Sequence, residues 1–147
     1  MLAGKVMAFG CFDLLHPGHL FYLKKAKSLG SELTVVVARD KTIEREKGHS
    51  PLLGEKERLA LVRALKPVDR ALLGAKDPEK KFSVLQKEAP GVIALGHDHL
   101  VTAKEIREKL REFSIKARVT RLPGYKPKKL RSSKMRKRVD LELDDLF

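Results

Sequence analysis

Two histidines separated by a Pro-Gly pair, His16-Pro17-Gly18-His19, are the residues of this 147-residue sequence best suited to phosphate chemistry. Their imidazoles can donate hydrogen bonds to a phosphate without carrying a permanent charge. They follow Gly10, which allows close approach of the backbone, and they open an expected helix whose N–H groups and dipole favour anions. The alternatives are that one histidine caps the helix while the other packs, or that the pair binds a metal, for which it supplies only two ligands.

The elements that must position these histidines alternate along the chain. Apolar and β-branched runs predict strands at 5–9, 32–39, 70–73, 91–95 and 116–122. Apolar residues at helical spacing predict helices at 18–29, 55–65, 78–88 and 102–113, and a last one from Ser132 or Ser133 to about residue 143. This alternation implies a single-domain, doubly wound (Rossmann-like) α/β fold, a five-stranded parallel sheet with helices on both faces. Ligands of such sheets bind beyond the carboxyl ends of the strands.

Positive charge is concentrated in two parts of the sequence. The 32 Lys+Arg residues outnumber the 19 Asp+Glu residues and give a formal net charge of +13. Eight basic residues lie in 126–138, ahead of an acidic tail at 139–147, and the expected loop at 40–54 is also basic. The basic excess predicts an anionic partner. Charge alone does not distinguish between nucleic acid, a membrane surface and a phosphorylated small molecule as that partner.

Several function classes are disfavoured by composition. The single cysteine, Cys11, excludes an internal disulfide and indicates a reducing compartment. No His–carboxylate pair is placed by the sequence to activate it as a nucleophile. The early apolar run at 6–12 is too short to span a membrane and lacks a cleavage site, so we expect a cytoplasmic protein with no membrane partner. Only 5% of the residues are aromatic, which disfavours a specific nucleic-acid partner.

Residues 10–29 resemble the signature of the HIGH-type nucleotidylyltransferases, in their cytidylyltransferase branch. The resemblance continues through segments that together span nearly the whole chain: 38–47, 58–69, 94–99 and 129–136. Within the family the sequence is most similar to archaeal-type FAD synthetases, with which it shares G-x-F-D-x-L-H-P-G-H, V-V-A-R-D and A-L-K-x-V-D-x-A-x-L-G. His97 and His99 stand where glycerol-phosphate cytidylyltransferases have Asp and Trp.

This resemblance implies transfer of AMP from ATP to FMN, which gives FAD and pyrophosphate by direct in-line attack. His16, His19 and Arg136 would be catalytic. The nucleotide would be bound by both histidines and by Gly10, Cys11, Phe12, Pro17, Gly18, Gly96, Asp98, Tyr125, Ser132 and Ser133. The acceptor would contact Asp13, Lys25, Arg45 and Lys47. Asp13 is also a candidate ligand for the expected cofactor, Mg²⁺ or another divalent cation, or alternatively the cap of the turn that follows it.

Two other functions remain open from the sequence. One is a cytidylyltransferase that uses CTP and acts on glycerol 3-phosphate or another phosphorylated alcohol. The other is a small nucleic-acid-binding protein that uses residues 126–138 as a basic arm. The Ser132-Ser133 pair inside this basic segment favours a phosphate-binding site over a nucleic-acid arm. The family resemblance also implies a homodimer.

Overall fold

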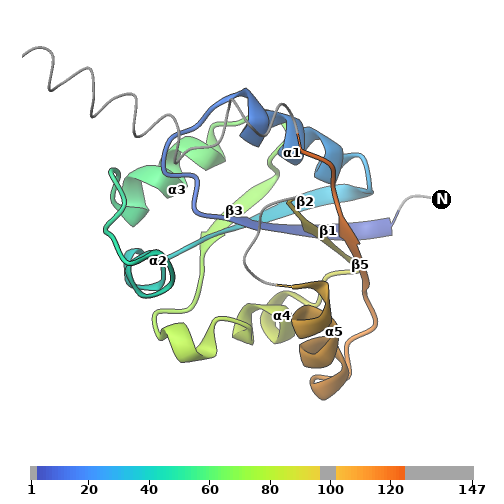
Figure 1. The fold of residues 1–147 in the computed structure, drawn as a ribbon. Coiled ribbons are helices and arrows are strands. Elements are labelled where there is room, and N and C mark those ends of the chain that lie inside the picture. Colours follow the sequence, from blue (N-terminus) through green and yellow to red (C-terminus); the bar gives the residue numbers. More distant parts are fainter. Residues whose placement is uncertain (1–2, 97–101, 125–147) are drawn as a thin grey trace, which may run out of the picture.

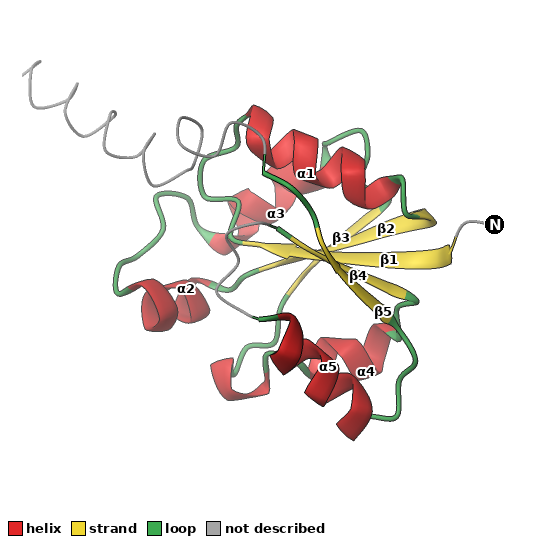
Figure 2. Ribbon diagram, turned by 45° about the vertical axis from the view of Figure 1, so that its right-hand side comes forward, coloured by secondary structure: helices red, strands yellow, loops and turns green. Residues whose placement is uncertain are grey.

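The computed structural model describes residues 3–96 and 102–124, which form a five-stranded parallel sheet with helices on both faces (Figures 1 and 2). The strands are β1 (Ala3–Gly10), β2 (Gly30–Val37), β3 (Arg70–Leu73), β4 (Val92–Leu95) and β5 (Arg118–Arg121). The helices are α1 (Pro17–Lys27), α2 (Asp40–Lys47), α3 (Glu55–Arg63), α4 (Ser83–Glu88) and α5 (Ala103–Glu112), with a 3-10 turn, η1, at Pro78–Lys80. The order β3-β2-β1-β4-β5 reverses between β1 and β4, so the predicted doubly wound fold is confirmed.

Two apolar layers hold the helices against the sheet (Figure 2). On one face α1 and α3 contribute Leu23 and Val62, and on the other α4 and α5 contribute Leu85 and Ile106. Strand β2 lies between these layers and is buried from residue 33 to residue 37. Burial on both faces explains why the sequence of β2 is a continuous apolar run rather than an alternating one.

Two predicted elements differ from the structure. The expected loop at 40–54 contains helix α2, so that prediction was wrong. Only Ile43 of α2 is buried, which means that the segment carries no apolar stripe to reveal a helix. The expected helix at 78–88 is divided into η1 and α4. The predicted last helix, the basic segment 126–138 and the acidic tail 139–147 lie outside the described residues.

None of the helices in the described part of the chain is both long and apolar enough to cross a membrane.

Candidate functional site

The turn between β1 and α1 begins with a close contact between Gly10 and Phe12. Phe12 has a φ of 53°, an uncommon conformation for a residue with a side chain, and its ring is only 2% exposed. A Cβ atom on Gly10 would lie 2.7 Å from two carbon atoms of that ring. The sequence explains Gly10 by the close approach of the backbone to a ligand. The packing of the Phe12 ring also requires a glycine at this position.

Replacing Gly10 with alanine is expected to lower the free energy of unfolding by about 1–3 kcal/mol, because the Phe12 ring must move. The F12L variant removes the ring, so the double variant G10A/F12L should be less destabilised than the sum of the two single changes. Urea unfolding of the three variants gives these free energies. Strictly additive losses would contradict the packing explanation.

His16 and His19 form a reciprocal cap at the start of α1. The backbone N–H of Gly18 donates to Nδ1 of His16 at 3.0 Å, and the backbone N–H of His16 donates to Nδ1 of His19 at 3.3 Å. A neutral imidazole whose Nδ1 accepts a hydrogen bond carries its proton on Nε2. The cap therefore fixes both rings in the tautomer that can offer an Nε2–H to an anion at this helix start.

The two imidazoles are also held by ring contacts. Their centroids lie 4.0 Å apart in a stacked arrangement, and the His19 ring contacts the Phe12 ring at 5.4 Å. The sequence offered capping and phosphate binding as alternatives for these histidines. In the structure the capping interaction itself orients the nitrogens that phosphate binding would use, so the two roles are compatible.

Asp13 holds the chain segment that precedes α3. One carboxylate oxygen accepts the backbone N–H of Leu52 at 2.8 Å and that of Leu53 at 3.0 Å, and the other lies 3.0 Å from the Leu52 nitrogen. The side chain is largely buried. These contacts join residues 39 and 40 positions apart in the chain, so they do not cap the turn that follows Asp13, and they involve both of its carboxylate oxygens.

Arg58 was not among the predicted site residues, yet it joins the segments that surround the site. Its side chain is fully buried and donates to three backbone carbonyls, those of Cys11 at 2.8 Å, Ala38 at 2.7 Å and Leu53 at 2.9 Å. A fourth hydrogen bond reaches the carboxylate of Asp40 at 2.6 Å. One guanidinium thus fixes the end of β1, the end of β2 and the segment before α3.

The thiol of Cys11 lies beside this network. Burial raises the pKa of the thiol, and Lys47 opposes the rise through a hydrogen bond and its charge. The charge of Arg58 also acts to lower this pKa. The net effect is a raised pKa, which agrees with the expectation that Cys11 is not an activated nucleophile.

Iodoacetamide is expected to alkylate Cys11 in the folded protein more slowly at neutral pH than it alkylates glutathione. The thiolate is the reactive form, and a raised pKa leaves less of it at neutral pH. The rate should therefore keep rising at pH values at which the rate for glutathione has levelled off. Mass spectrometry counts the product unambiguously because the chain has one cysteine. The K47A variant should react still more slowly, whereas equal rates for folded protein and glutathione would contradict the prediction.

The predicted acceptor residues are only partly brought together. Lys25 lies in the last turn of α1, near the amino end of β2, so the structure does not bring it to the start of this helix. A rise of 1.5 Å per residue places it about 12 Å along the helix from the first turn. Lys47 does reach the end of β1, since it acts on the Cys11 thiol.

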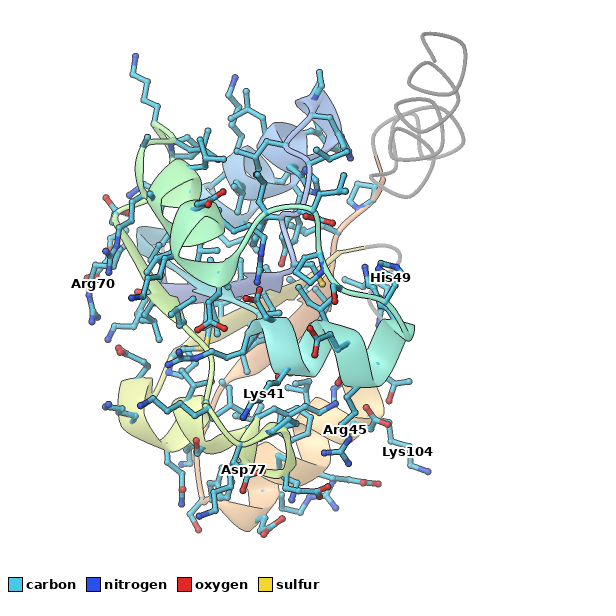
Figure 3. The ribbon with its side chains drawn as sticks, turned by 90° about the vertical axis from the view of Figure 1, so that its left-hand side faces the viewer. Lys41, Arg45, His49, Arg70, Asp77 and Lys104 are labelled. Atoms are coloured by element: carbon cyan, nitrogen blue, oxygen red, sulfur yellow. The ribbon has the colours of Figure 1, made fainter. Side chains whose placement is uncertain are left out.

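Helix α2 carries the last of the predicted acceptor residues, Arg45, and also Lys41. Figure 3 shows Lys41 and Arg45 on the side of α2 that faces Asp77, at the start of η1. Arg45 forms an ion pair with Glu79 of η1, and Lys81 forms one with Glu46 of α2. These pairs connect α2 with the η1 segment, and Arg45 is thereby engaged within the protein.

Other predicted nucleotide contacts follow β4 or lie near the C-terminus. Gly96 directly follows β4, and its carbonyl accepts a hydrogen bond from Arg121 at 2.6 Å. The remaining predicted contacts lie outside the described residues: Asp98, Tyr125, Ser132, Ser133 and Arg136.

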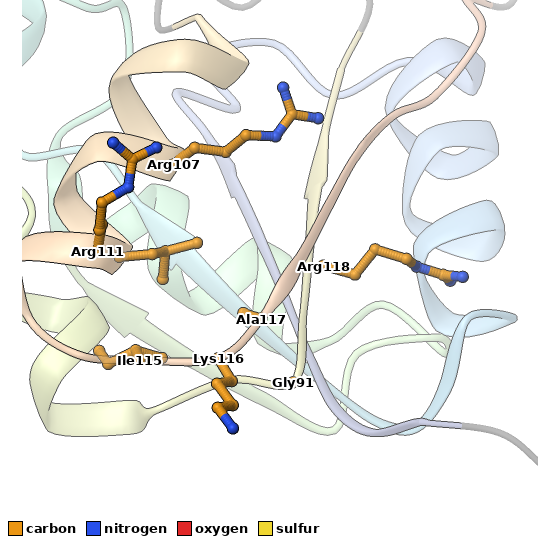
Figure 4. Close-up of a pocket in the computed structure, with 8 residues that line it drawn as sticks. Gly91, Arg107, Arg111, Ile115, Lys116, Ala117 and Arg118 are labelled. Atoms are coloured by element: carbon orange, nitrogen blue, oxygen red, sulfur yellow. The ribbon is translucent and has the colours of Figure 1, made fainter.

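A surface groove of about 660 Å³ lies by the amino ends of β4 and β5, at the end of the sheet opposite to the candidate site (Figure 4). Four cations line it: Arg107, Arg111, Lys116 and Arg118. In Figure 4 they point in different directions rather than toward one centre. Because the groove is also remote from the carboxyl ends of the strands, we do not assign the phosphate site to it.

The Mg²⁺ ion expected from the sequence stays a prediction. Within residues 3–96 and 102–124, no group of three or more His, Cys, Asp or Glu side chains could hold one. Asp13, the predicted ligand, binds backbone amides through both of its oxygens.

The fold and the site together define a doubly wound α/β protein that presents a helix start and two imidazole donors at the switch point of its sheet. Comparison with known proteins agrees with this class. The chain belongs to the cytidylyltransferase-like family, whose model matches residues 7–138. This confirms the predicted family, and the chain is a nucleotidyltransferase.

Individual relatives match almost the whole chain. The FAD synthase of Aciduliprofundum boonei is 46% identical over 145 residues, which cover 97% of this chain and 95% of the relative. The FAD synthase of Methanothermus fervidus is 43% identical over 145 residues, which cover 95% of this chain and 98% of the relative. The crystal structure of the lipopolysaccharide core biosynthesis protein from Thermoplasma volcanium is 41% identical, with a TM-score of 0.78 over 84% of this chain and 98% of that one.

Proposed function

We propose that this chain makes FAD by transferring AMP from ATP to FMN. An oxygen of the FMN phosphate attacks the α-phosphorus of ATP in line and forms a new P–O–P linkage. The bond from the α-phosphorus to the bridging oxygen breaks, and pyrophosphate leaves. The attacking group is already an anion, so the protein contributes positioning and charge stabilisation rather than a covalent intermediate. The FAD synthase names of relatives that match nearly the whole chain support these substrates.

The reciprocal cap of α1 by His16 and His19 is the observation that carries the proposal. Two neutral Nε2–H donors would bind oxygens of the α- and β-phosphates as charge builds up on them. The N-terminus of α1 would add its backbone N–H groups and its positive dipole end. Backbone N–H groups of Cys11 and Phe12 would bind the nucleotide from the end of β1.

The rest of the substrate contacts are assigned to residues near the C-terminus and after β4. The nucleoside and the terminal phosphates would be bound by residues outside the described part: Asp98, Tyr125, Ser132, Ser133 and Arg136. We also propose that Mg²⁺ enters with the substrate as MgATP, since this ion keeps several waters and takes few protein ligands. The enzyme would act in the cytoplasm as a homodimer, without a nucleic-acid or membrane partner.

Pyrophosphate release with defined substrate pairs tests the proposal. Full-length protein is incubated under reductant and MgCl₂ with FMN plus ATP, FMN plus CTP, or glycerol 3-phosphate plus CTP. We expect release with FMN plus ATP, and chromatography should show FAD in equal amount. Release only with CTP and glycerol 3-phosphate would exclude FAD synthesis but leave the transfer chemistry. Absence of release with every pair would exclude the proposed reaction.

A further inference from the structure

Strands β1 and β4 separate before either of them ends. β1 stays paired with β2 as far as Gly10, opposite Val37, but its pairing with β4 stops at Ala8, opposite Ala94. Both strands continue beyond that pair, β1 to Gly10 and β4 to Leu95. Since the strand order reverses between these two strands, they diverge where a doubly wound sheet binds its ligand.

The hydroxyl of Tyr22 lies between the two strands where they diverge. The backbone N–H of Phe9 donates to Oη of Tyr22 at 3.2 Å, and Oη donates to the carbonyl oxygen of Ala94 at 2.6 Å. The side chain is 9% exposed and packs in the apolar layer beneath α1. A residue of α1 thus joins β1 to β4 at their last directly paired residues, Ala8 and Ala94.

We propose that Tyr22 is a positioning residue whose hydroxyl sets the separation of β1 and β4, and with it the width of the nucleotide crevice. This inference rests on the proposed function. Helix α1 carries His16 and His19 at its start, and Tyr22 follows His16 by less than two helical turns. The Tyr22 hydroxyl therefore fixes the start of α1, where phosphate would bind, relative to the segments that follow β1 and β4.

The chemistry of a phenol suits this position. A hydroxyl can accept from an N–H and donate to a carbonyl at the same time. Phenylalanine would fill the same space in the core but would leave the Phe9 N–H and the Ala94 carbonyl without this bridge. These two groups already face each other across the Ala8–Ala94 pair. Without the hydroxyl between them, we expect β1 and β4 to close until their direct hydrogen bond is short, because poorly paired buried backbone groups are costly. The crevice would then be narrower.

The Y22F variant tests the inference through the Michaelis constants of the two substrates. We expect the KM for ATP to rise about tenfold while the KM for FMN changes less than about twofold, because the displaced groups bind the nucleotide and a misplacement of about 1 Å can cost about 10²-fold. I106V is the matched control: Ile106 is buried on α5, on the other face of the sheet. Both variants should lose a few degrees of Tm, about 3–8 °C, but I106V should keep both KM values.

Two kinetic outcomes would overturn the inference. One is an equal rise in both KM values for Y22F, which would indicate general loosening rather than a change at the nucleotide crevice. The other is a Y22F variant that matches I106V in both KM and Tm, which would indicate a purely structural tyrosine.

A second readout does not depend on activity. The chain has two tyrosines, so a ¹³Cζ-tyrosine NMR spectrum of the full-length protein contains two side-chain signals, and the one missing in Y22F belongs to Tyr22. Saturating α,β-methylene ATP should shift that signal. A shift in a protein that makes no FAD would refute the proposed function but support the positioning role. An unmoved signal would overturn the positioning role whether or not FAD forms.

Discussion

The H16N variant is expected to lose about 10²–10³-fold in kcat while keeping nearly the Tm of the wild type. Asparagine is among the best N-cap residues, and its Oδ1 can accept the Gly18 N–H in place of Nδ1. Asparagine has no atom where Nε2 of His16 lies, so the donor to the phosphate is lost. Removing one such donor usually lowers kcat by about 10²–10³-fold. Steady-state kinetics with FMN and MgATP, with thermal melting alongside, measures both effects.

The H16Q variant provides the complementary test. Its amide reaches toward the position of Nε2 but gives up the cap at Nδ1, so it should retain more activity than H16N and have a lower Tm. The K25A variant is the control on the same helix, and its kcat and both KM values should be unchanged. A kcat for H16N within about tenfold of the wild type would contradict a direct role for His16 at the phosphate.

Much of this fold could be predicted because its elements carry local signals. Helix α5 starts where the capping box predicted: the backbone N–H of Glu105 donates to the Thr102 hydroxyl at 3.1 Å, and the Glu105 carboxylate accepts the Thr102 N–H. Helix α2 was missed because its one buried residue, Ile43, gives no periodicity, although Gly48 ends it in the left-handed conformation that favours glycine.

The candidate site was predictable only where its residues are neighbours in the sequence. His16 and His19 stand three residues apart at one helix start, whereas Tyr22 contacts Ala94 across 72 residues and Arg58 contacts Cys11 across 47. Those contacts depend on which strands are neighbours, which local patterns do not specify. A weaker signal was present, because Arg58 lies in phase with the apolar face of α3 at Val62.

Replacing Arg58 with methionine is expected to lower the free energy of unfolding by about 3–5 kcal/mol. The change leaves three backbone carbonyls without their donor, at about 1–3 kcal/mol for each buried group that stays unpaired, and removes the partner of Asp40. The free energy of unfolding of a whole domain is about 5–15 kcal/mol, so this loss would be a large part of it. Urea unfolding of the full-length protein measures it.

Two further variants separate the role of the planar guanidinium of Arg58 from the role of its charge and of its place on α3. R58K keeps a positive charge but cannot reproduce the planar fork that serves several acceptors, so we expect it to recover only part of the loss. R63A is the matched control on α3, because Arg63 is exposed and makes a single hydrogen bond, to the Ala71 carbonyl at 3.2 Å, worth about 1 kcal/mol or less.

Equal losses for R58M and R63A would mean that the buried guanidinium does not hold these segments together. If R58M is the more destabilised, the ends of β1 and β2 and the segment before α3 depend on one side chain. Residual activity of R58M should then fall together with its stability, since the Cys11 carbonyl belongs to the nucleotide turn.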